Sequence, residues 1–266
     1  MKIIFWNIKK KDLVNEIDDL VKAEFPDILI LCECTIPTAD LLLKLNTPKT
    51  LYYFIGTKGK SIRIFTSFSD NCVEIKEDSA RYSILEISLP LKTKFLLTPL
   101  YIPDRRNWSA QSQNIECISI SSRIIDIEKN EGINDSIAVG DFNMNPFDEG
   151  MISTLGFHAV RDEVIALKKG RVVQGKYYKF FFNPMWNFYS SNKKPKGTYY
   201  YWNSEHVCHF WNIFDQFLLR PELIGKLNSG DFGIITKFKQ HDLTTSDGLI
   251  SEGYSDHLPI KATFNI

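Results

Sequence analysis

Residues 137–143 read Ile-Ala-Val-Gly-Asp-Phe-Asn, an apolar run that passes directly into an acid and an amide. A short apolar run bounded by turn-forming residues is typical of a buried strand, so Asp141 and Asn143 are expected at its end. Because they lie two residues apart in extended chain, both side chains point to the same side. Both residue types also favour turns, and Pro146 follows, so a chain reversal is compatible with a functional pair.

Three further polar patches stand at the ends of apolar runs. Residues 3–5 precede Asn7, residues 28–31 precede Glu33, and Ser255-Asp256-His257 comes just before the apolar start of the last expected strand. If these strand ends meet at one rim, they gather carboxylates, amides and an imidazole. Such a set suits the hydrolysis of a phosphate ester with a divalent metal ion.

Asp215 is an acid within the apolar run Ile-Phe-Asp-Gln-Phe-Leu-Leu at residues 213–219. Burying a carboxylate is costly unless a partner neutralises it or donates hydrogen bonds to it. His257 is a natural partner, because the acid would fix the tautomer of the imidazole and favour its protonated form. A protonated His257 could stabilise charge that develops on a phosphate. The alternative is an ordinary surface or core histidine.

Composition predicts one globular domain over residues 1–266. The chain is 44% hydrophobic and 24% charged, which is enough apolar material for a full core. Its formal net charge is zero, so attraction to a polyanion must come from local patches. Five cysteines are an odd number, which favours a reduced, cytoplasmic protein over a disulfide framework. The apolar stretch at the N-terminus is too short for a signal peptide or a membrane span, and no protein partner is indicated.

Strands and helices are expected in mixed order. Residues 3–8 and 27–32 read as strands around a helix that Pro26 closes, a unit that gives parallel pairing. Further strands are expected at residues 61–67, 73–76, 82–89 and 95–101, and a long helix from about Ser109 to Lys129. The face of this helix marked by Ile115, Ile118, Ser122 and Ile125 is expected to be buried. This order fits two packed sheets flanked by helices.

A segment between Val164 and Ser204 contains eight lysines and arginines and no acid. It is also rich in aromatic residues. Lysines can neutralise phosphates and aromatic rings can stack on unpaired bases, so the segment favours a polyanionic partner near the site. The alternative is a hairpin whose rings fill the core of the second sheet, with Lys193 and Lys194 in a solvated turn.

These motifs, in this order, resemble those of the endonuclease/exonuclease/phosphatase superfamily, which includes DNase I-like nucleases. The resemblance runs from Asn7 to His257 and implies an α/β fold, a four-layer αββα sandwich of two mixed sheets face to face with helices outside. It also implies a hydrolase that uses Mg²⁺ or Mn²⁺ and in-line attack of water on a phosphodiester, most simply in a nucleic acid.

The resemblance assigns roles residue by residue. It implies metal-site roles for Glu33, Asn7 and Asp256, and catalytic roles for Asp141, Asn143, His257, Asp215 and Tyr101. Contacts with the substrate are expected from Arg105, Arg106, Lys193, Lys194, Trp202 and Trp211.

Departures from the family patterns bear on the branch. Gln216 stands where inositol-polyphosphate 5-phosphatases have an arginine after the acid, which argues against that branch. Cys34 and Lys9 depart from the abasic-site endonuclease pattern, so a nuclease of another specificity is favoured. A phosphomonoesterase, a phospholipid-type phosphodiesterase and a non-catalytic binding member of the fold remain as alternatives.

Overall fold

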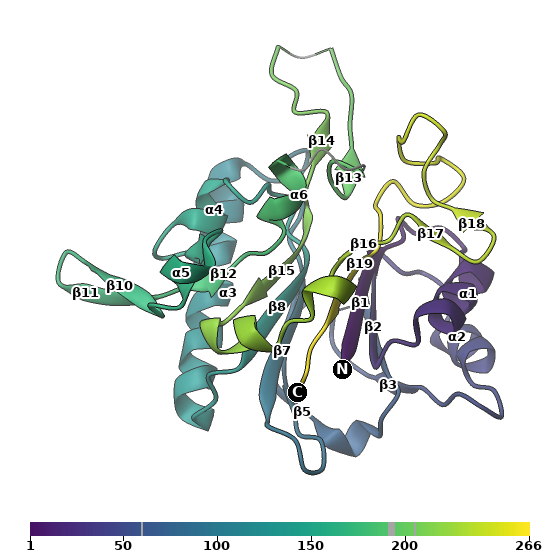
Figure 1. Cartoon of the computed structure of the whole chain (residues 1–266), viewed down its shortest axis with the longest axis horizontal. Helices are drawn as coiled ribbons and strands as arrows, with labels where there is room; N and C mark the ends of the chain where they lie inside the picture. Colours follow the sequence, from purple (N-terminus) through teal and green to yellow (C-terminus); the bar gives the residue numbers. More distant parts are fainter. Residues whose placement is uncertain (60, 191–194, 205) are drawn as a thin grey trace.

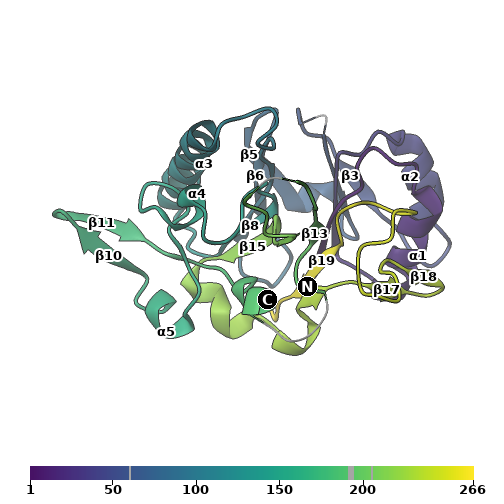
Figure 2. The ribbon, with the colours of Figure 1, turned by 90° about the horizontal axis from the view of Figure 1, so that it is seen from above.

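Two β-sheets pack face to face, and helices cover the outer face of each (Figure 1). The computed structural model describes residues 1–59, 61–190, 195–204 and 206–266. Seen from above, α1 and α2 lie on one side of the sheets and α3 and α4 on the other (Figure 2). The predicted four-layer αββα sandwich is confirmed.

The first sheet has six strands, and its centre is the strand–helix–strand unit expected at the start of the chain. β1 and β2 pair in parallel, and every residue of β2 is buried. The other pairings in this sheet are antiparallel. In spatial order the strands are β16 (Gly233–Ile234), β19 (Ile260–Thr263), β1 (Lys2–Asn7), β2 (Ile28–Cys32), β4 (Ile62–Thr66) and β3 (Tyr53–Ile55).

The second sheet has seven strands and is likewise mixed. β7 pairs with β8 in parallel, whereas β15 runs antiparallel to β8. In spatial order the strands are β5 (Val73–Asp78), β6 (Ser83–Ile87), β7 (Phe95–Tyr101), β8 (Ser136–Asp141), β15 (Asp215–Leu219), β12 (Phe181–Phe182) and β9 (Ala159–Val160).

The described chain also contains six α-helices and three small hairpins outside the two sheets. The helices are α1 (Val14–Glu24), α2 (Thr38–Leu45), α3 (Ala110–Glu131), α4 (Glu149–Ile152), α5 (Glu163–Ala166) and α6 (Trp186–Ser190). The hairpins pair β10 (Gly170–Val173) with β11 (Lys176–Lys179), β13 (Tyr199–Tyr200) with β14 (Trp211–Asn212), and β17 (Lys237–Phe238) with β18 (His241–Asp242).

Three apolar clusters account for the layers. One fills the space between the two sheets, with Phe5 and Ile30 facing Val139 and Phe217. A second lies between the first sheet and α1 and α2, and a third between the second sheet and α3. Burial of apolar surface contributes about 25 cal/mol per Å², so these interfaces are the main stabilising contribution to the fold.

The long helix α3 was predicted with the correct ends but with the wrong buried face. Ser109 caps its start by accepting from the backbone N–H of Ser112, and Gly132 ends it in the left-handed conformation. Ile115 and Ile125 are exposed, whereas the buried stripe includes Cys117, Ile120, Ile124 and the polar residues Gln113 and Glu128. Isoleucines lie on both faces, and hydrogen bonds make the buried polar positions tolerable.

Candidate active site

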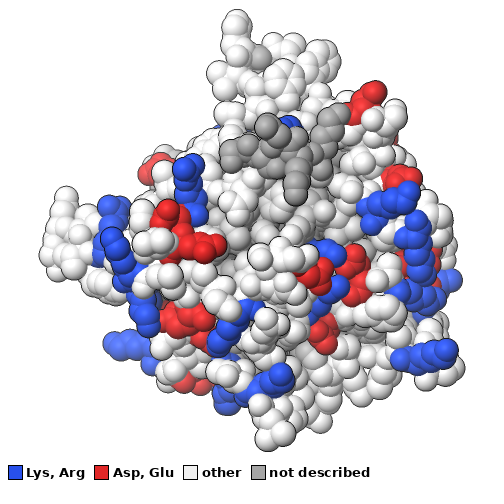
Figure 3. Space-filling view, viewed as in Figure 1, with Lys and Arg blue, Asp and Glu red and all other residues white. Residues whose placement is uncertain are grey.

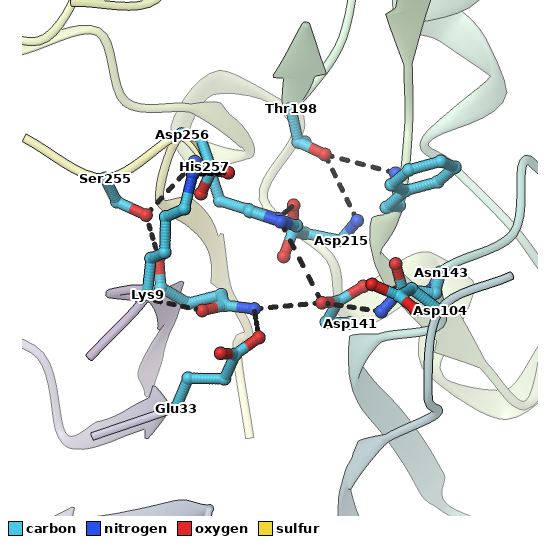
Figure 4. A network of polar contacts seen from close by, with 12 residues as sticks. Lys9, Glu33, Asp104, Asp141, Asn143, Thr198, Asp215, Ser255, Asp256 and His257 are labelled. Atoms are coloured by element: carbon cyan, nitrogen blue, oxygen red, sulfur yellow. Dashed lines mark hydrogen bonds and ion pairs between the residues drawn. The ribbon is translucent and has the colours of Figure 1, made fainter. Parts of the chain in front are cut away.

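The polar patches meet at one rim of the sandwich, as the strand ends predicted. Asn7 ends β1, Glu33 follows β2, and Asp141 ends β8. Asp215 begins β15 directly opposite Asp141 in the ladder, and His257 lies just before β19. Figure 4 shows the side chains of Glu33, Asp141, Asp215 and His257 gathered in one network of polar contacts.

Asn7 connects the carboxylates of Glu33 and Asp141. Its amide Nδ2 donates to Glu33 Oε1 at 3.2 Å and to Asp141 Oδ2 at 2.9 Å, so one amide holds carboxylates from both sheets. Its Oδ1 accepts from the backbone N–H of Lys9 at 3.0 Å. Asn7 is therefore a fixed bridge between Glu33 and Asp141.

Asn143 combines the two readings of its sequence motif. Its backbone N–H donates to Asp141 Oδ1 at 2.9 Å, an Asx turn, and its φ of 48° places it in the left-handed region. Its Nδ2 also donates to Asp141 Oδ2 at 3.1 Å and to the carbonyl of Ile102 at 2.9 Å. The Asx turn therefore brings the side chains of Asp141 and Asn143 together.

Asp215 and His257 form the predicted pair. His257 Nδ1 lies 2.8 Å from Asp215 Oδ2, and both side chains are buried. Thr198 Oγ1 accepts from the backbone N–H groups of Phe214 and Asp215 at 3.2 and 3.1 Å, which holds the start of β15. With Nδ1 engaged, Nε2 of His257 is left on the side of Asp141, 4.0 Å from its Oδ2.

Backbone contacts fix the position of His257 as well. Ser255 Oγ donates to the carbonyl of Asn7 at 2.5 Å and accepts from the backbone N–H of His257 at 3.1 Å. Trp6 Nε1 donates to the carbonyl of His257 at 3.0 Å. The Ser-Asp-His motif is thereby tied to the end of β1.

Burial and charge shift the pKa values of the site. Burial raises the pKa of Asp141, and the charge of Asp215 adds to this, against the opposing effect of His257. Burial alone would lower the pKa of His257, but the charges of Asp215 and Asp141 outweigh it and raise the pKa. Burial, with the charges of Glu33 and Asp141, raises the pKa of Tyr101, so its hydroxyl stays protonated. Asp141, Asp215 and His257 form a buried acid–acid–imidazole group.

These residues open into a pocket of about 670 Å³. Tyr101 lines it beside Asp141, its partner in the β7–β8 ladder. The lining includes five carboxylates, those of Glu33, Asp104, Asp141, Asp148 and Asp256, together with Lys9, Arg105, Arg106 and the imidazoles of His209 and His257. The buried oxygens Asp256 Oδ1, in the lining, and Asp215 Oδ1, outside it, accept no hydrogen bond from the described residues. The pocket therefore offers several carboxylate oxygens beside cationic groups.

Lys9 lines the pocket and forms an ion pair with Asp256, its Nζ 2.5 Å from Oδ2. The side chain of Lys9 therefore points into the site. Its ammonium neutralises the carboxylate that the resemblance assigns to the metal side, so Glu33 is the acid left facing the pocket without such a cation among the described residues.

Only some of the residues expected to contact the substrate line the pocket. Arg105 and Arg106 line the pocket, where Arg105 bonds Asp148 at 3.0 Å and Arg106 bonds Asp104. Trp202 is 69% exposed, and Trp211 packs on Tyr200 with ring centroids 5.2 Å apart; neither lines the pocket. Lys193 and Lys194 lie outside the described residues.

The acid-free basic segment is not one surface. Lys168, Lys169, Arg171, Lys176 and Lys179 lie in or beside the β10–β11 hairpin, which projects from the second sheet away from the β13–β14 hairpin (Figures 1 and 2). Lys169 and Lys179 are paired with acids of the same protein. The cations of the segment therefore do not form one continuous patch beside the site, because the chain enters the second sheet through β12 between the two halves of the segment.

Gln113 is a residue of the site that carried no recognisable signal in the sequence. It is fully buried in α3 and donates to the carbonyls of Pro103 and Asn143 at 2.9 and 3.2 Å, so it supports the loops that follow β7 and β8. Its role could not be found without knowing which elements pack together. Tyr199, one of the aromatic residues of the acid-free segment, lies with its ring centroid 4.7 Å from that of His257.

Among the described residues, no helix is both long and apolar enough to cross a membrane.

Comparisons with known proteins bear on the fold. No family model matches the chain, and a search of curated proteins found no match. Among solved structures, truncated Caenorhabditis elegans TDP2 is similar with a TM-score of 0.58 and 19% identity, covering 99% of this chain and 96% of that one. An AP endonuclease from Archaeoglobus fulgidus gives a TM-score of 0.58 at 16% identity, with 100% of both chains covered.

A third similar structure is an endonuclease/exonuclease/phosphatase family protein from Bacteroides thetaiotaomicron, with a TM-score of 0.59, 12% identity and coverage of 98% and 96%. All three likenesses extend over nearly the whole of both chains, at identities that speak for the fold alone. The chain therefore has the fold of the endonuclease/exonuclease/phosphatase superfamily.

Proposed function

We propose that the protein is a divalent-metal-dependent phosphodiesterase that hydrolyses nucleic acid, a nuclease. The observation that carries this proposal is the single cluster at the rim, in which Asn7 joins Glu33 to Asp141 while Asp215 holds His257 across from them. The similar structures support it, since the one from Archaeoglobus fulgidus is an AP endonuclease.

The residues of the pocket fit a hard divalent cation such as Mg²⁺ or Mn²⁺. The lining has five carboxylates, and the buried Oδ1 of Asp256 lacks a partner among the described residues. Oxygen ligands are those that Mg²⁺ prefers. Glu33 would hold the ion, with Asn7 beside it and Asp256, whose Oδ2 pairs with Lys9, offering its Oδ1. When bound, such an ion polarises a phosphoryl oxygen and offsets the negative charge of the substrate.

The remaining chemistry belongs to side chains of this chain. Asp141, held by Asn7 and Asn143, orients a water and accepts its proton as it attacks phosphorus. Tyr101 donates a hydrogen bond to the phosphate without adding charge, and Asn143, whose Nδ2 is bonded to Asp141 and to the carbonyl of Ile102, holds Asp141 beside it. His257, kept in one orientation by Asp215, presents Nε2 to a phosphoryl oxygen and stabilises its growing charge. Because these groups are already held in place, little free energy is needed to orient them for the reaction.

A substrate panel tests this proposal. Purified protein is incubated with single-stranded and duplex DNA, RNA, abasic DNA, inositol phosphates and a phospholipid, each with Mg²⁺, Mn²⁺ or EDTA. Metal-dependent cleavage of a nucleic acid, lost in Asp141→Ala and in His257→Ala, is the expected result. If only inositol phosphates or the phospholipid are hydrolysed, the protein is a phosphomonoesterase or a phospholipid-type phosphodiesterase and not a nuclease. Cleavage that survives in EDTA or in both variants contradicts the site.

A further inference from the structure

One wall of the pocket is an aromatic hairpin, which comprises β13, β14 and the described residues between them. It rises above the rim at the top of Figure 1. Between Tyr199 and Asn212 the sequence has no lysine or arginine. In Figure 3 the projection at the top is almost free of blue, whereas Lys and Arg stand on both sides of the body below it.

Two tyrosines of the hairpin face the pocket. Tyr199 of β13 and Tyr201, just after it, line the pocket, whereas Tyr200 between them packs on Trp211. In extended chain successive side chains point to opposite faces, which accounts for this alternation. The two tyrosines line the pocket together with Asn203, Val207, Cys208, His209 and Asn212.

The tyrosines extend a column of near-parallel rings that begins at the half-buried Phe214 in the lining of the pocket. Phe214 and Tyr199 have centroids 5.2 Å apart and planes 26° apart. Tyr199 and Tyr201 follow at 6.4 Å and 22°. Tyr199 also lies against His257, so the column passes directly beside the group that would meet phosphate. Tyr201 is 48% exposed and is the last ring of the column.

The hairpin is held in place before any ligand arrives. The backbone N–H of Tyr201 donates to the carbonyl of Phe210 at 2.8 Å, and His209 packs on Phe147 at 5.4 Å. Holding the rings in this way removes part of the entropy cost of binding.

The charges of the pocket favour stacking on bases over contacts with the phosphate backbone of a nucleic acid. The cations of the pocket, Lys9, Arg105 and Arg106, each pair with an acid of the pocket. Extended capture of a duplex backbone needs a run of unpaired cations, and the hairpin supplies none. Paired bases would also hide the ring faces that a stacking column meets.

We propose that the Tyr199–Tyr201 column is a stacking platform for an unpaired base next to the phosphate under attack, so that the substrate is single-stranded nucleic acid or a frayed end. This rests on the proposed function, because it takes the phosphate site to be the cluster around His257. Tyr201 supplies the outermost ring, and the base of the bound nucleotide continues the column.

Fluorescence anisotropy in EDTA tests the platform with the full chain. The probes are a labelled strand of about 12 thymidines, the same strand in a duplex, and a baseless sugar-phosphate strand of equal length. Wild-type protein is expected to bind the thymidine strand at least about 5-fold more tightly than either of the others. In Tyr201→Ala this preference disappears, with a loss of about 5- to 100-fold on the thymidine strand. Tyr201→Phe retains the ring and the preference.

Tyr177→Ala is the matched control, since Tyr177 is 53% exposed on the β10–β11 hairpin, and it retains the preference. Equal or tighter binding of duplex, or a preference that survives in Tyr201→Ala, overturns the platform. Cleavage in Mn²⁺ is measured in parallel on the same strands. Cleavage without base preference contradicts the platform alone, whereas base preference without metal-dependent cleavage contradicts the proposed function alone.

Discussion

Asp215 is a buried carboxylate, and its pairing with His257 accounts for its burial. It stands at the first position of β15, with no exposed surface, and accepts from His257 Nδ1 at 2.8 Å. A buried charge without a partner would cost several kcal/mol, so the pair is a requirement of the fold as well as of the chemistry. Asp215 acts through His257 and is a positioning residue.

Asp215→Asn tests that positioning role. The amide has the shape of the acid but not its charge, so His257 loses the partner that favours its protonated form. We expect the turnover number to fall by about 10²- to 10⁴-fold with Mn²⁺ and an oligonucleotide. The pH at which activity declines on the alkaline side should also fall, a change that a purely structural role would not give.

Thr198→Val is the companion variant, because it removes the hydroxyl that holds the backbone of Phe214 and Asp215 but leaves the charge. A smaller loss, without the shift of the pH profile, is expected. Turnover by Asp215→Asn within about threefold of the wild type would contradict the positioning role.

At the scale of elements, β7 and β8 must approach closely for Tyr101 and Asp141 to share the rim. A Cβ on Gly140 would meet the carbonyl oxygen of Leu100 at 2.0 Å, which is far inside van der Waals contact. The backbone of β7 cannot move aside without disturbing both strands. Glycine at this position is what allows the acid of the motif to follow a parallel strand pair.

Gly140→Ala is expected to destabilise the protein by about 1–3 kcal/mol, the usual cost of forcing extra volume into a packed interior. Urea unfolding followed by circular dichroism measures this change. Gly225→Ala is the matched control, because a Cβ there meets nothing within 4 Å, and its stability should match the wild type. Equal stability of the two variants would contradict the close approach of β7 and β8.

The elements differ in how far sequence could predict them. β1, β2, β7 and β8 are short apolar runs, so periodicity and length placed them, and with them Asn7, Glu33 and Asp141. The aromatic hairpin and the β10–β11 hairpin belong to the same acid-free, tyrosine-containing segment, yet one lines the site and the other projects elsewhere. That difference depends on the pairing of β12 with β15 and β9, which no local pattern specifies.

Buried polar residues were the other difficulty. Gln113 looks like an ordinary helix residue in the sequence, and only the packing of α3 against the loops after β7 and β8 gives it hydrogen-bond partners. The predicted apolar face of α3 failed for the same reason. Asp215, in contrast, was predictable, because an acid in an apolar run must find a partner.

For the whole molecule, acid stability is set by carboxylates held by lysines. Glu86 in β6 is 3% exposed and bonds Lys94 at 2.6 Å and Lys76 at 3.0 Å. The hydrogen bond from Lys94, with that from Lys76 and against the effect of burial, lowers the pKa of Glu86 to about 2. Because its folded-state pKa is below the ordinary 4.5, Glu86 stabilises the fold above that pH.

This contribution is lost as the pH falls through about 2. Glu86→Gln is expected to lower the free energy of unfolding by about 1–3 kcal/mol at neutral pH, and the difference should shrink as the pH approaches the folded-state pKa. Thermal or urea unfolding across pH checks this. Glu74→Gln, on the same Lys76 but at a 67% exposed side chain, should change stability little. A pH-independent difference for Glu86→Gln would contradict the assignment.

If the cluster at the rim hydrolyses phosphodiesters with a divalent ion, cleavage must depend both on the metal and on Asp141. The initial rate of cleavage of a labelled oligonucleotide is measured in Mn²⁺ and in EDTA, for the wild type, Asp141→Asn, and Asp242→Asn as an exposed control on β18. The wild type and the control are expected to cleave only in Mn²⁺, with a loss of about 10²-fold or more in Asp141→Asn. Equal rates for Asp141→Asn and the wild type, or equal rates with and without metal, would show that the cluster is not a metal-dependent active site.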